Sequence, residues 1–440
     1  MISHDGGEAR RRRVPLLLRL LGIHDATIAE RRATTWVAAM FLFTLASTSL
    51  LRPLRDQFGV DQGVAAMPRL YTWTLVATVV GVLPFWWLAN RVPSRRFVPA
   101  TQFACIGAVV ALAIALLSIG DYDWKQVPWL GEVFWGGFSA LNVILPSLVW
   151  IHAVEHFSRA QGRRLFGLVA VGGTTGAVMG SWATGSLAKT APPWTMAVLT
   201  AVLITAALVC FVASQRSCRE LHRDGAPRNE VARGGTFAAL PMLVREPRVR
   251  ALAIYMLFVA VLATTFAASQ TAILGAEIDE ARKQHEKLAN IEFWSQATVL
   301  ALQLFCTGRL LQRLPLALFL VALPCASVLG LSAVAMWPTV AVISAVQIAR
   351  RGVQHAFDRP GREVLYTPLD LETKHKAKFV LETFVFRLGD LAGAIVIVQL
   401  AANSVVAVSI GVALAWVGLG TWLGRRHGAD AAAAQRASIS

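Results

Sequence analysis

The chain has 440 residues, of which 55% are hydrophobic and only 15% are charged. Soluble chains are usually about a quarter charged, so this composition argues against an ordinary soluble protein and indicates a polytopic membrane protein. The formal net charge of +16 does not indicate nucleic-acid binding, because the basic residues follow the membrane topology that the apolar runs predict.

Residues 1–32 form a basic arm. Its first apolar patch is short, Arg19 interrupts it and no small-residue cleavage site follows, so a secretory signal is not predicted. PLLLRLLGIHDATIAERR, residues 15–32, favours an amphipathic helix lying in the cytoplasmic membrane interface.

Apolar runs of about 20 residues, each long enough to cross a bilayer as a helix, then recur along the chain. They predict an all-α polytopic membrane protein with twelve transmembrane helices in two six-helix halves. The halves cover residues 33–215 and 251–424, with a cytoplasmic middle loop at 216–250 and a cytoplasmic tail at 425–440. The predicted spans are 33–51, 68–89, 98–118, 129–153, 165–188, 194–215, 251–276, 293–311, 315–336, 338–355, 379–401 and 403–424.

Basic residues orient this topology. In the twelve-span arrangement, 33 of the 42 Lys and Arg residues lie on the side that carries both termini. Because positive charge accumulates in cytoplasmic connections, both termini are predicted to be cytoplasmic. Arg52 and Arg55 then lie on the opposite side, against this bias, where Arg52 has the simple interpretation of an interfacial anchor.

The two halves with a long middle loop resemble the major facilitator superfamily, whose halves rock about a site near the middle of the membrane. LANRVPSRR after the second span is similar to the short basic loop of that family and supplies Asn90, Arg91, Arg95 and Arg96 as conformational-loop residues. The alternative is that any short cytoplasmic loop is basic.

Enzymatic chemistry is not indicated. The chain has no nucleotide-binding G-x-x-x-x-G-K-[ST] motif and no concentrated hydrolase or glycosidase set. GGTTGAVMGSWATG, residues 172–185, lies inside an apolar span, where Gly173, Gly176, Ala177 and Gly180 favour close helix packing. The five cysteines predict neither a disulfide framework nor a metal site, and no cofactor is expected.

Ionisable and amide groups within spans are the candidate site, because such groups are costly in hydrocarbon and usually face an aqueous cavity. Arg387 and Asp390 are three residues apart and can pair on one helix face, as a structural salt bridge or as a switching pair. The polar segment 277–292 has Glu/Lys spacing suited to a short helix or a helix extension into the periplasm. It is interpreted as a solvated linker, with a gate as the alternative. The candidates are Arg55, Asp56, Asn142, Glu155, Gln270, Glu382, Arg387 and Asp390.

Three segments carry a more specific resemblance. LLRPLRDQF ends the first span, QGRRLFG follows the fourth with Glu155 before it and Arg163 and Arg164 within it, and RLGD lies in the eleventh. In this order they are similar to segments of the ATP/ADP translocase family, and particularly to its bacterial nucleotide-exchanger-like branch. The resemblance implies a transporter of the bacterial inner membrane and adds Arg163 and Arg164 to the conformational loops.

The departures from that family concern its charged residues. Arg55 stands where the nucleotide carriers keep a lysine, Glu155 is retained, Asp390 replaces a lysine, and Gln270 is the nearest counterpart of a glutamate near spans seven and eight. A carboxylate in place of a cation disfavours a polyphosphate. The fold is therefore a firmer expectation than nucleotide exchange.

Two functions compete. One is a secondary transporter that works by alternating access on a small anionic or zwitterionic solute, nucleotides included, with a coupling proton or a counter-substrate. The other is a non-transporting receptor, scaffold or lipid-handling protein built on the same fold. A charge set sealed by packing favours the second, and a water-accessible one favours the first.

Overall fold

The computed structural model describes residues 26–89, 91–120, 122, 124, 127–223, 246–307, 314–367, 377–378, 380–400 and 402–437, and these residues contain helices and no strand. The predicted arm through residue 25 and the loop residue Asn90 lie outside the described residues. The all-α prediction is confirmed.

The N-terminal half has six membrane-crossing segments. Its second segment is built from short pieces with a π-helical stretch between them. The elements are α2 (Ile28–Gln62), η1 (Val64–Ala66), α3 (Met67–Ala77), η2 (Thr78–Val82), α4 (Leu83–Ala89), α5 (Ser94–Ile119), α6 (Pro128–His156), α7 (Arg159–Leu187) and α8 (Pro193–Arg223). Helices α2, α5 and α6 each contain an interior proline that the surrounding packing tolerates.

The C-terminal half also has six segments, and π-helical stretches interrupt three of them. Such stretches often mark functional positions in helices. The elements are α10 (Pro247–Glu277), α11 (Ala281–Leu302), η5 (Gln303–Thr307), α13 (Leu316–Met336), α14 (Val340–Val353), η6 (Gln354–Asp358), α15 (Arg359–Leu365), η7 (Val380–Val385), α17 (Phe386–Gln399) and α18 (Ala402–Ala437).

Within the described residues, nine helical segments are long and apolar enough to cross a membrane on length and composition alone. The segments containing α11, α14 and α17 do not reach that threshold. Glu292, Arg350, Arg351, Arg387 and Asp390 lie on these three helices, so these segments hold several of the charged groups inside the bundle.

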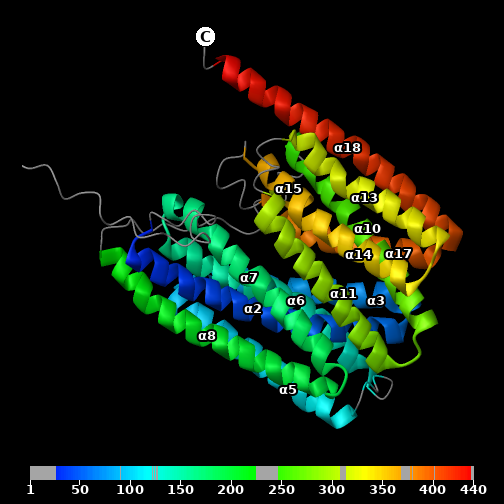
Figure 1. The fold of residues 1–440 in the computed structure, drawn as a ribbon, viewed down its shortest axis with the longest axis horizontal. Coiled ribbons are helices and arrows are strands. Elements are labelled where there is room, and N and C mark those ends of the chain that lie inside the picture. Colours follow the sequence, from blue (N-terminus) through cyan, green and yellow to red (C-terminus); the bar gives the residue numbers. More distant parts are fainter. Residues whose placement is uncertain are drawn as a thin grey trace, which may run out of the picture.

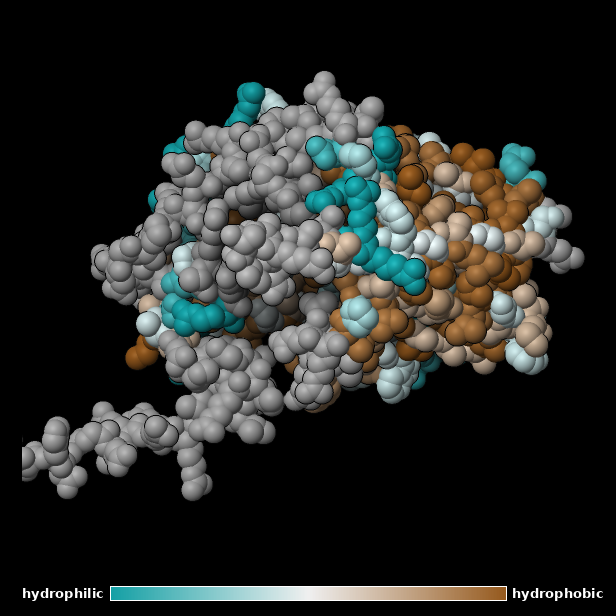
Figure 2. Space-filling view, turned by 90° about the horizontal axis from the view of Figure 1, so that it is seen from above, coloured by the Kyte–Doolittle hydropathy of each residue, from teal (hydrophilic) through white to brown (hydrophobic). Residues whose placement is uncertain are grey.

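Figure 1 shows the two halves side by side, with α2, α5, α6, α7 and α8 in one and α10, α13, α14 and α18 in the other. In that view α2 starts and α18 ends towards the same end of the bundle, called here the terminal end; the opposite end is called the far end. Hydrophobic side chains cover a wide area of the face in Figure 2, and hydrophilic ones gather towards one end of it.

Small residues bring α7 against α2, as the glycine pattern predicts. A Cβ on Gly172 would lie 2.7 Å from the Ala38 carbonyl oxygen, and a Cβ on Gly176 would overlap the backbone of Leu42. The two backbones are therefore in direct contact, and any side chain at these positions would separate the helices. This confirms the predicted close packing.

A buried polar network holds the C-terminal half together near its terminal end. The Tyr255 hydroxyl donates to Asp358 Oδ1 at 2.6 Å, and Arg362 Nε donates to Asp358 Oδ2 at 2.9 Å. Arg362 and Asp358 have side chains only 8% and 0% exposed. This is a sealed structural ion pair.

Two predictions about the segments flanking the first and eighth spans are wrong. The first helix does not end near residue 51, because α2 continues through Pro53 to Gln62; Arg52 and Arg55 are therefore inside a helix. The segment 277–292 is not a solvated linker, because α11 begins at Ala281 and buries His285, Leu288 and Glu292.

The far end of the interface is tied by contacts between the halves. Tyr122 Oη lies 2.7 Å from His285 Nδ1, and Lys189 Nζ lies 3.5 Å from Glu286 Oε1. A Cβ on Gly185 of α7 would lie 3.7 Å from the Ala289 Cβ of α11. These contacts place α11 directly against the N-terminal half.

Candidate functional site

One buried carboxylate joins the two halves in the interior of the bundle. Glu292 of α11 is 2% exposed; its Oε1 lies 3.5 Å from Arg52 Nε of α2, and its Oε2 accepts a hydrogen bond from Arg351 of α14. Gln296 Nε2 donates to Glu292 Oε1 at 2.8 Å. A buried carboxylate is stable only when paired and hydrogen-bonded, and here both halves supply the partners.

Arg52 also reaches α6. Its Nη2 donates to Asn142 Oδ1 at 3.4 Å, so the predicted candidate Asn142 does lie against the charged groups. Arg52 is therefore not an interfacial anchor: its guanidinium links a side-chain amide of its own half to a carboxylate of the other half.

Arg55 lies one helical turn further along α2 and is held by a neighbouring acid and two rings. Its Nε donates to Asp56 Oδ1 at 2.9 Å. The guanidinium carbon lies 4.6 Å from the Trp135 ring centroid and 5.0 Å from that of Phe138. Stacking on ring faces suits the planar guanidinium better than an ammonium, which explains why this site accommodates an arginine.

The predicted pair on α17 forms as expected. Arg387 Nη1 donates to Asp390 Oδ2 at 2.9 Å, and Thr264 of α10 lies 3.3 Å from Asp390 Oδ1. The Asp390 carboxyl interacts electrostatically with Arg55 and with Tyr71 of α3 across the interface. The eleventh segment thus faces the first and second segments.

These groups form one electrostatically connected set. Arg55 interacts with Glu292 as well as with Asp390, and Arg52 interacts with Arg55, Asp56 and Arg351. We call the set the central charge cluster, and its members are Arg52, Arg55, Asp56, Glu292, Arg351, Arg387 and Asp390.

Water access distinguishes this cluster from a structural ion pair. Arg52 and Arg55 keep 28% and 22% of their side-chain surface exposed, although each is bonded to an acid. The Arg362 side chain, in the sealed pair with Asp358, is 8% exposed. The arginine side chains of the cluster are thus less completely covered than that of Arg362.

Gln270 lies in a second polar row, in the C-terminal half. Gln347 Nε2 donates to Gln270 Oε1 at 2.8 Å, and Arg350 Nη2 donates to Gln347 Oε1 at 3.3 Å. Arg350 also stacks 5.1 Å from the Phe266 ring centroid. Arg350 is therefore a buried arginine in addition to the four of the cluster, and it is next in sequence to Arg351.

Two predicted candidates lie apart from the cluster. Glu155 is thirteen residues from Asn142 on α6, about 20 Å along a helix axis, near the terminal end of α6. Glu382 lies in η7, about 12 Å along the axis from Asp390, and interacts electrostatically with Arg362 and Tyr366. Neither is placed with the groups that join the halves.

The predicted conformational-loop residues lie at the terminal end. Arg91 stacks 4.2 Å from the Trp87 ring centroid, and Arg95 and Arg96 are exposed at the start of α5. Arg164 Nη2 lies 3.1 Å from Glu30 Oε1 and so ties α7 to α2. The side chain of Arg163 lies outside the described residues.

Sequence reasoning missed Glu292 and Arg351 as members of the site. For Glu292 the signal was the spacing of polar residues in α11, where Gln284, His285, Glu292 and Ser295 are buried at helical intervals. A solvated linker would not repeat polar residues on one face.

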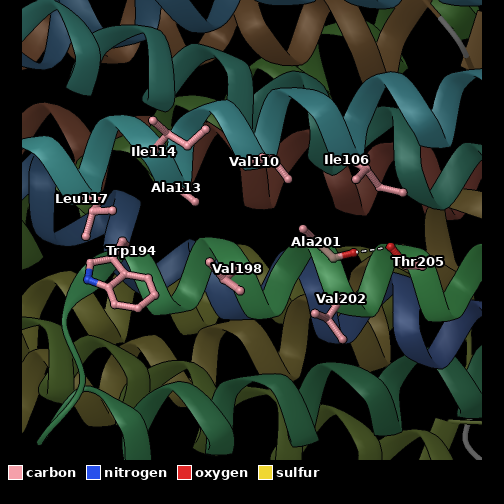
Figure 3. Close-up of a pocket in the computed structure, with 10 residues that line it drawn as sticks. All are labelled: Ile106, Val110, Ala113, Ile114, Leu117, Trp194, Val198, Ala201, Val202 and Thr205. Carbon is pink, nitrogen blue, oxygen red and sulfur yellow. Dashed lines mark hydrogen bonds between the residues drawn. The ribbon is translucent and has the colours of Figure 1, made fainter.

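Two other features lie outside the cluster. A groove of about 530 Å³ between α5 and α8 is lined by apolar side chains such as Ile114, Trp194 and Val202 (Figure 3). Ile114 and Val202 are exposed on the bundle surface, so this groove faces the surroundings of the bundle rather than the interface. A group of potential metal ligands, His152, His156 and Cys218, lies on α6 and α8.

A twelve-segment bundle in two halves, with charged groups where they meet, is the fold of major facilitator transporters. The nucleoside transporter NupG has a TM-score of 0.59 at 16% sequence identity, covering 92% of this chain and 99% of NupG. A bacterial homologue of the human lysosomal transporter Spinster, in an inward-facing and unoccupied conformation, has a TM-score of 0.57 at 12% identity, covering 91% and 99%. No protein-family model and no curated protein matches the chain. The solved structures are those of transporters and not of enzymes, and they share this chain's fold.

Proposed function

We propose that this protein is a secondary transporter of the bacterial inner membrane that moves a small anionic or zwitterionic solute by alternating access. The observation that carries the proposal is the central charge cluster, because both halves contribute to it and the side chains of Arg52 and Arg55 remain partly exposed. A site near the middle of the membrane, between two repeats, is where such transporters bind their solute.

The charge of the cluster supports an anionic group on the solute. Four guanidinium groups face three carboxylates, which leaves one formal positive charge. Arg55 is the primary contact in this proposal, because its planar fork suits a carboxylate or phosphate. A solute anion would compete with Asp56 for that fork.

The orientation follows from the basic residues of the sequence. The terminal end is the cytoplasmic end, since most Lys and Arg residues lie on that side of the topology even when Arg350 and Arg351, which lie inside the bundle, are left out. The Tyr122–His285 and Lys189–Glu286 contacts then close the periplasmic end. The described conformation corresponds to a state closed towards the periplasm.

Nucleotide exchange is the second candidate. Asp390 is bonded to Arg387 at 2.9 Å, so the sign reversal at this position does not leave an unpaired carboxylate to repel a phosphate. A surplus of one positive charge is nevertheless small for a nucleoside triphosphate. Counterflow of radiolabelled ATP against internal ADP tests exchange directly, and absence of counterflow with folded protein would remove this candidate.

A receptor, scaffold or lipid-handling role is the competing class. It would be served by a charge set sealed by packing, as in the Arg362–Asp358 pair. The accessible surface of Arg52 and Arg55 favours transport over this class.

The test starts from a thermal-shift screen of purified full-length protein with small carboxylates, amino acids and nucleoside monophosphates, since a ligand of the native state raises the melting temperature. Uptake of each compound that shifts the melting temperature is then measured in proteoliposomes.

Arg55→Gln should lower this uptake at least tenfold. Arg69→Gln is the matched control, because Arg69 pairs with Glu132 at 2.7 Å on an exposed position outside the cluster. Equal uptake by wild type and folded Arg55→Gln contradicts the binding assignment.

A further inference from the structure

Three potential metal ligands converge between α6 and α8, near the terminal end of the N-terminal half. One ligand atom from each of His152, His156 and Cys218 can be chosen so that all three lie within 4.8 Å of one another. His152 and Cys218 are fully buried. The sequence did not predict this group, because Cys218 lies on a different helix and is far in sequence from the two histidines.

The hydrogen bonds of His152 fix which nitrogen it presents. Ser214 Oγ donates to the Phe211 carbonyl oxygen at 2.7 Å, so the same oxygen can accept from His152 Nε2, also 2.7 Å away. The ring proton then lies on Nε2 and the lone pair on Nδ1. Nδ1 is buried and has no hydrogen-bond partner.

His156 is fixed in the complementary tautomer. Its Nδ1 lies 2.9 Å from the carbonyl oxygen of His152, and a carbonyl can only accept, so Nδ1 carries the proton and Nε2 the lone pair. Metal-ligating histidines commonly donate their second ring N–H to a backbone carbonyl or another oxygen, which sets the tautomer and the ring orientation. Both rings have that arrangement here.

We propose that His152 Nδ1, His156 Nε2 and Cys218 Sγ bind a thiophilic metal ion of the Zn²⁺ class. Imidazole nitrogen and thiolate sulfur are both ligand atoms of Zn²⁺, and three protein ligands leave a fourth position for water. In a tetrahedral site the ligand atoms are about 3.5 Å apart, so side-chain rotations would bring the three ligand atoms from the present arrangement onto one ion. Cys218 loses its thiol proton on binding.

Binding would join α6 to α8. Glu155 and the α6–α7 connection lie next to His156 in sequence, and Cys218 lies five residues before the end of α8 at Arg223. The ion would therefore stiffen the terminal end of the N-terminal half, at a distance from the central charge cluster. The proposal does not depend on the transport proposal.

Cobalt is the direct probe, because a Co²⁺–thiolate bond gives a near-ultraviolet charge-transfer band and a tetrahedral site gives intense visible bands. Full-length protein stripped with a chelator should bind one Co²⁺ per chain with both signatures, and Zn²⁺ should displace it and raise the melting temperature. Cys218→Ser should lose the charge-transfer band. Cys210→Ser, a buried thiol on the same helix, is the matched control and should retain it.

Two further variants keep the test decisive if Cys218→Ser does not fold. His156→Gln, at a partly buried position, should weaken Co²⁺ binding at least tenfold. Ser214→Ala should weaken it about 10–100-fold, as loss of a supporting hydrogen bond does at other metal sites. Wild-type protein that binds no Co²⁺, or folded Cys218→Ser or His156→Gln that binds it with the wild-type spectrum and affinity, overturns the proposal.

Discussion

Arg52 and Glu292 meet across the two halves of the protein, with 3.5 Å between Arg52 Nε and Glu292 Oε1. Arg351 occupies the other carboxylate oxygen, so one acid holds two guanidinium groups that would otherwise repel each other. Any motion that separates the halves must break the Arg52 contact, while the contact to Arg351 within the C-terminal half can persist. The pair is therefore placed to respond to the relative position of the two halves.

Glu292→Gln should destabilise this conformation, because it removes the buried carboxylate and leaves two partly buried guanidinium groups facing a neutral amide. Removing one partner of a buried ion pair costs about 3–5 kcal/mol, measured as a lower melting temperature of the purified protein. Glu286→Gln is the control. Glu286 also pairs across the halves, but with the exposed Lys189, and such a pair is worth less than about 1 kcal/mol. Equal melting temperatures of the two variants would contradict the role assigned to Glu292.

Gly176→Ala should separate α7 from α2. A methyl group at this position overlaps the backbone of Leu42, and backbone cannot turn aside as a flexible side chain can. Overpacking of this kind costs about 1–3 kcal/mol. A methyl group at Gly167 on the same helix meets nothing within 4 Å. Gly167→Ala should therefore add up to about 1 kcal/mol of stability through helix propensity, and its melting temperature should equal or exceed that of the wild type. A stable Gly176→Ala variant would mean that the two helices are not in backbone contact.

The contrast between Gly176 and Glu292 shows what the sequence could predict. Apolar run length and small-residue spacing are local properties, so the number of segments, the two halves, and the packing of α7 could be predicted from sequence alone. The Arg387–Asp390 pair was predictable for the same reason, since both residues lie on one turn of one helix.

Contacts between distant segments could not be predicted in this way. Glu292 was assigned to a polar linker because hydropathy falls before the eighth span, whereas its partners Arg52 and Arg351 come from the first and tenth segments. The metal-ligand group has the same origin, because Cys218 meets His152 and His156 only when α8 packs beside α6. A single sequence holds no direct signal for which helices become neighbours.

Acidification should weaken the far-end contacts through His285. This histidine lies in the part of α11 before the predicted span, and burial, together with the nearby charge of Arg282, lowers its pKa to about 3. An unfolded histidine has a pKa of about 6.5. The native state therefore binds fewer protons, so the stability contribution is complete above about pH 6.5 and is lost as the pH falls towards about 3.

The measurement is the melting temperature as a function of pH, where each pH unit in that window is worth at most about 1.4 kcal/mol. His285→Gln should flatten the dependence, and Tyr122→Phe, which removes the hydroxyl bonded to His285 Nδ1, should lower the melting temperature without flattening it. A wild-type slope retained in His285→Gln would assign the pH dependence to other groups.

A disulfide across the far end should stop transport reversibly. A Cβ on Gly185 of α7 lies 3.7 Å from the Ala289 Cβ of α11, which is close to the mean Cβ–Cβ separation of about 3.8 Å in disulfides. Gly185→Cys with Ala289→Cys should therefore cross-link under mild oxidation, hold the two halves together at that end, and abolish uptake in proteoliposomes until a reductant is added.

The matched control places a disulfide within one half. A Cβ on Gly81 of η2 lies 3.5 Å from the Ala140 Cβ of α6, and both segments belong to the N-terminal half. Gly81→Cys with Ala140→Cys should cross-link as readily and leave uptake within about twofold of wild type, because rocking of two rigid halves moves no atom of one half relative to another of the same half. Uptake that survives complete cross-linking of Gly185→Cys with Ala289→Cys would rule out separation of the halves at the far end as a step of transport. Equal inhibition by both disulfides would instead show that the N-terminal half itself must deform.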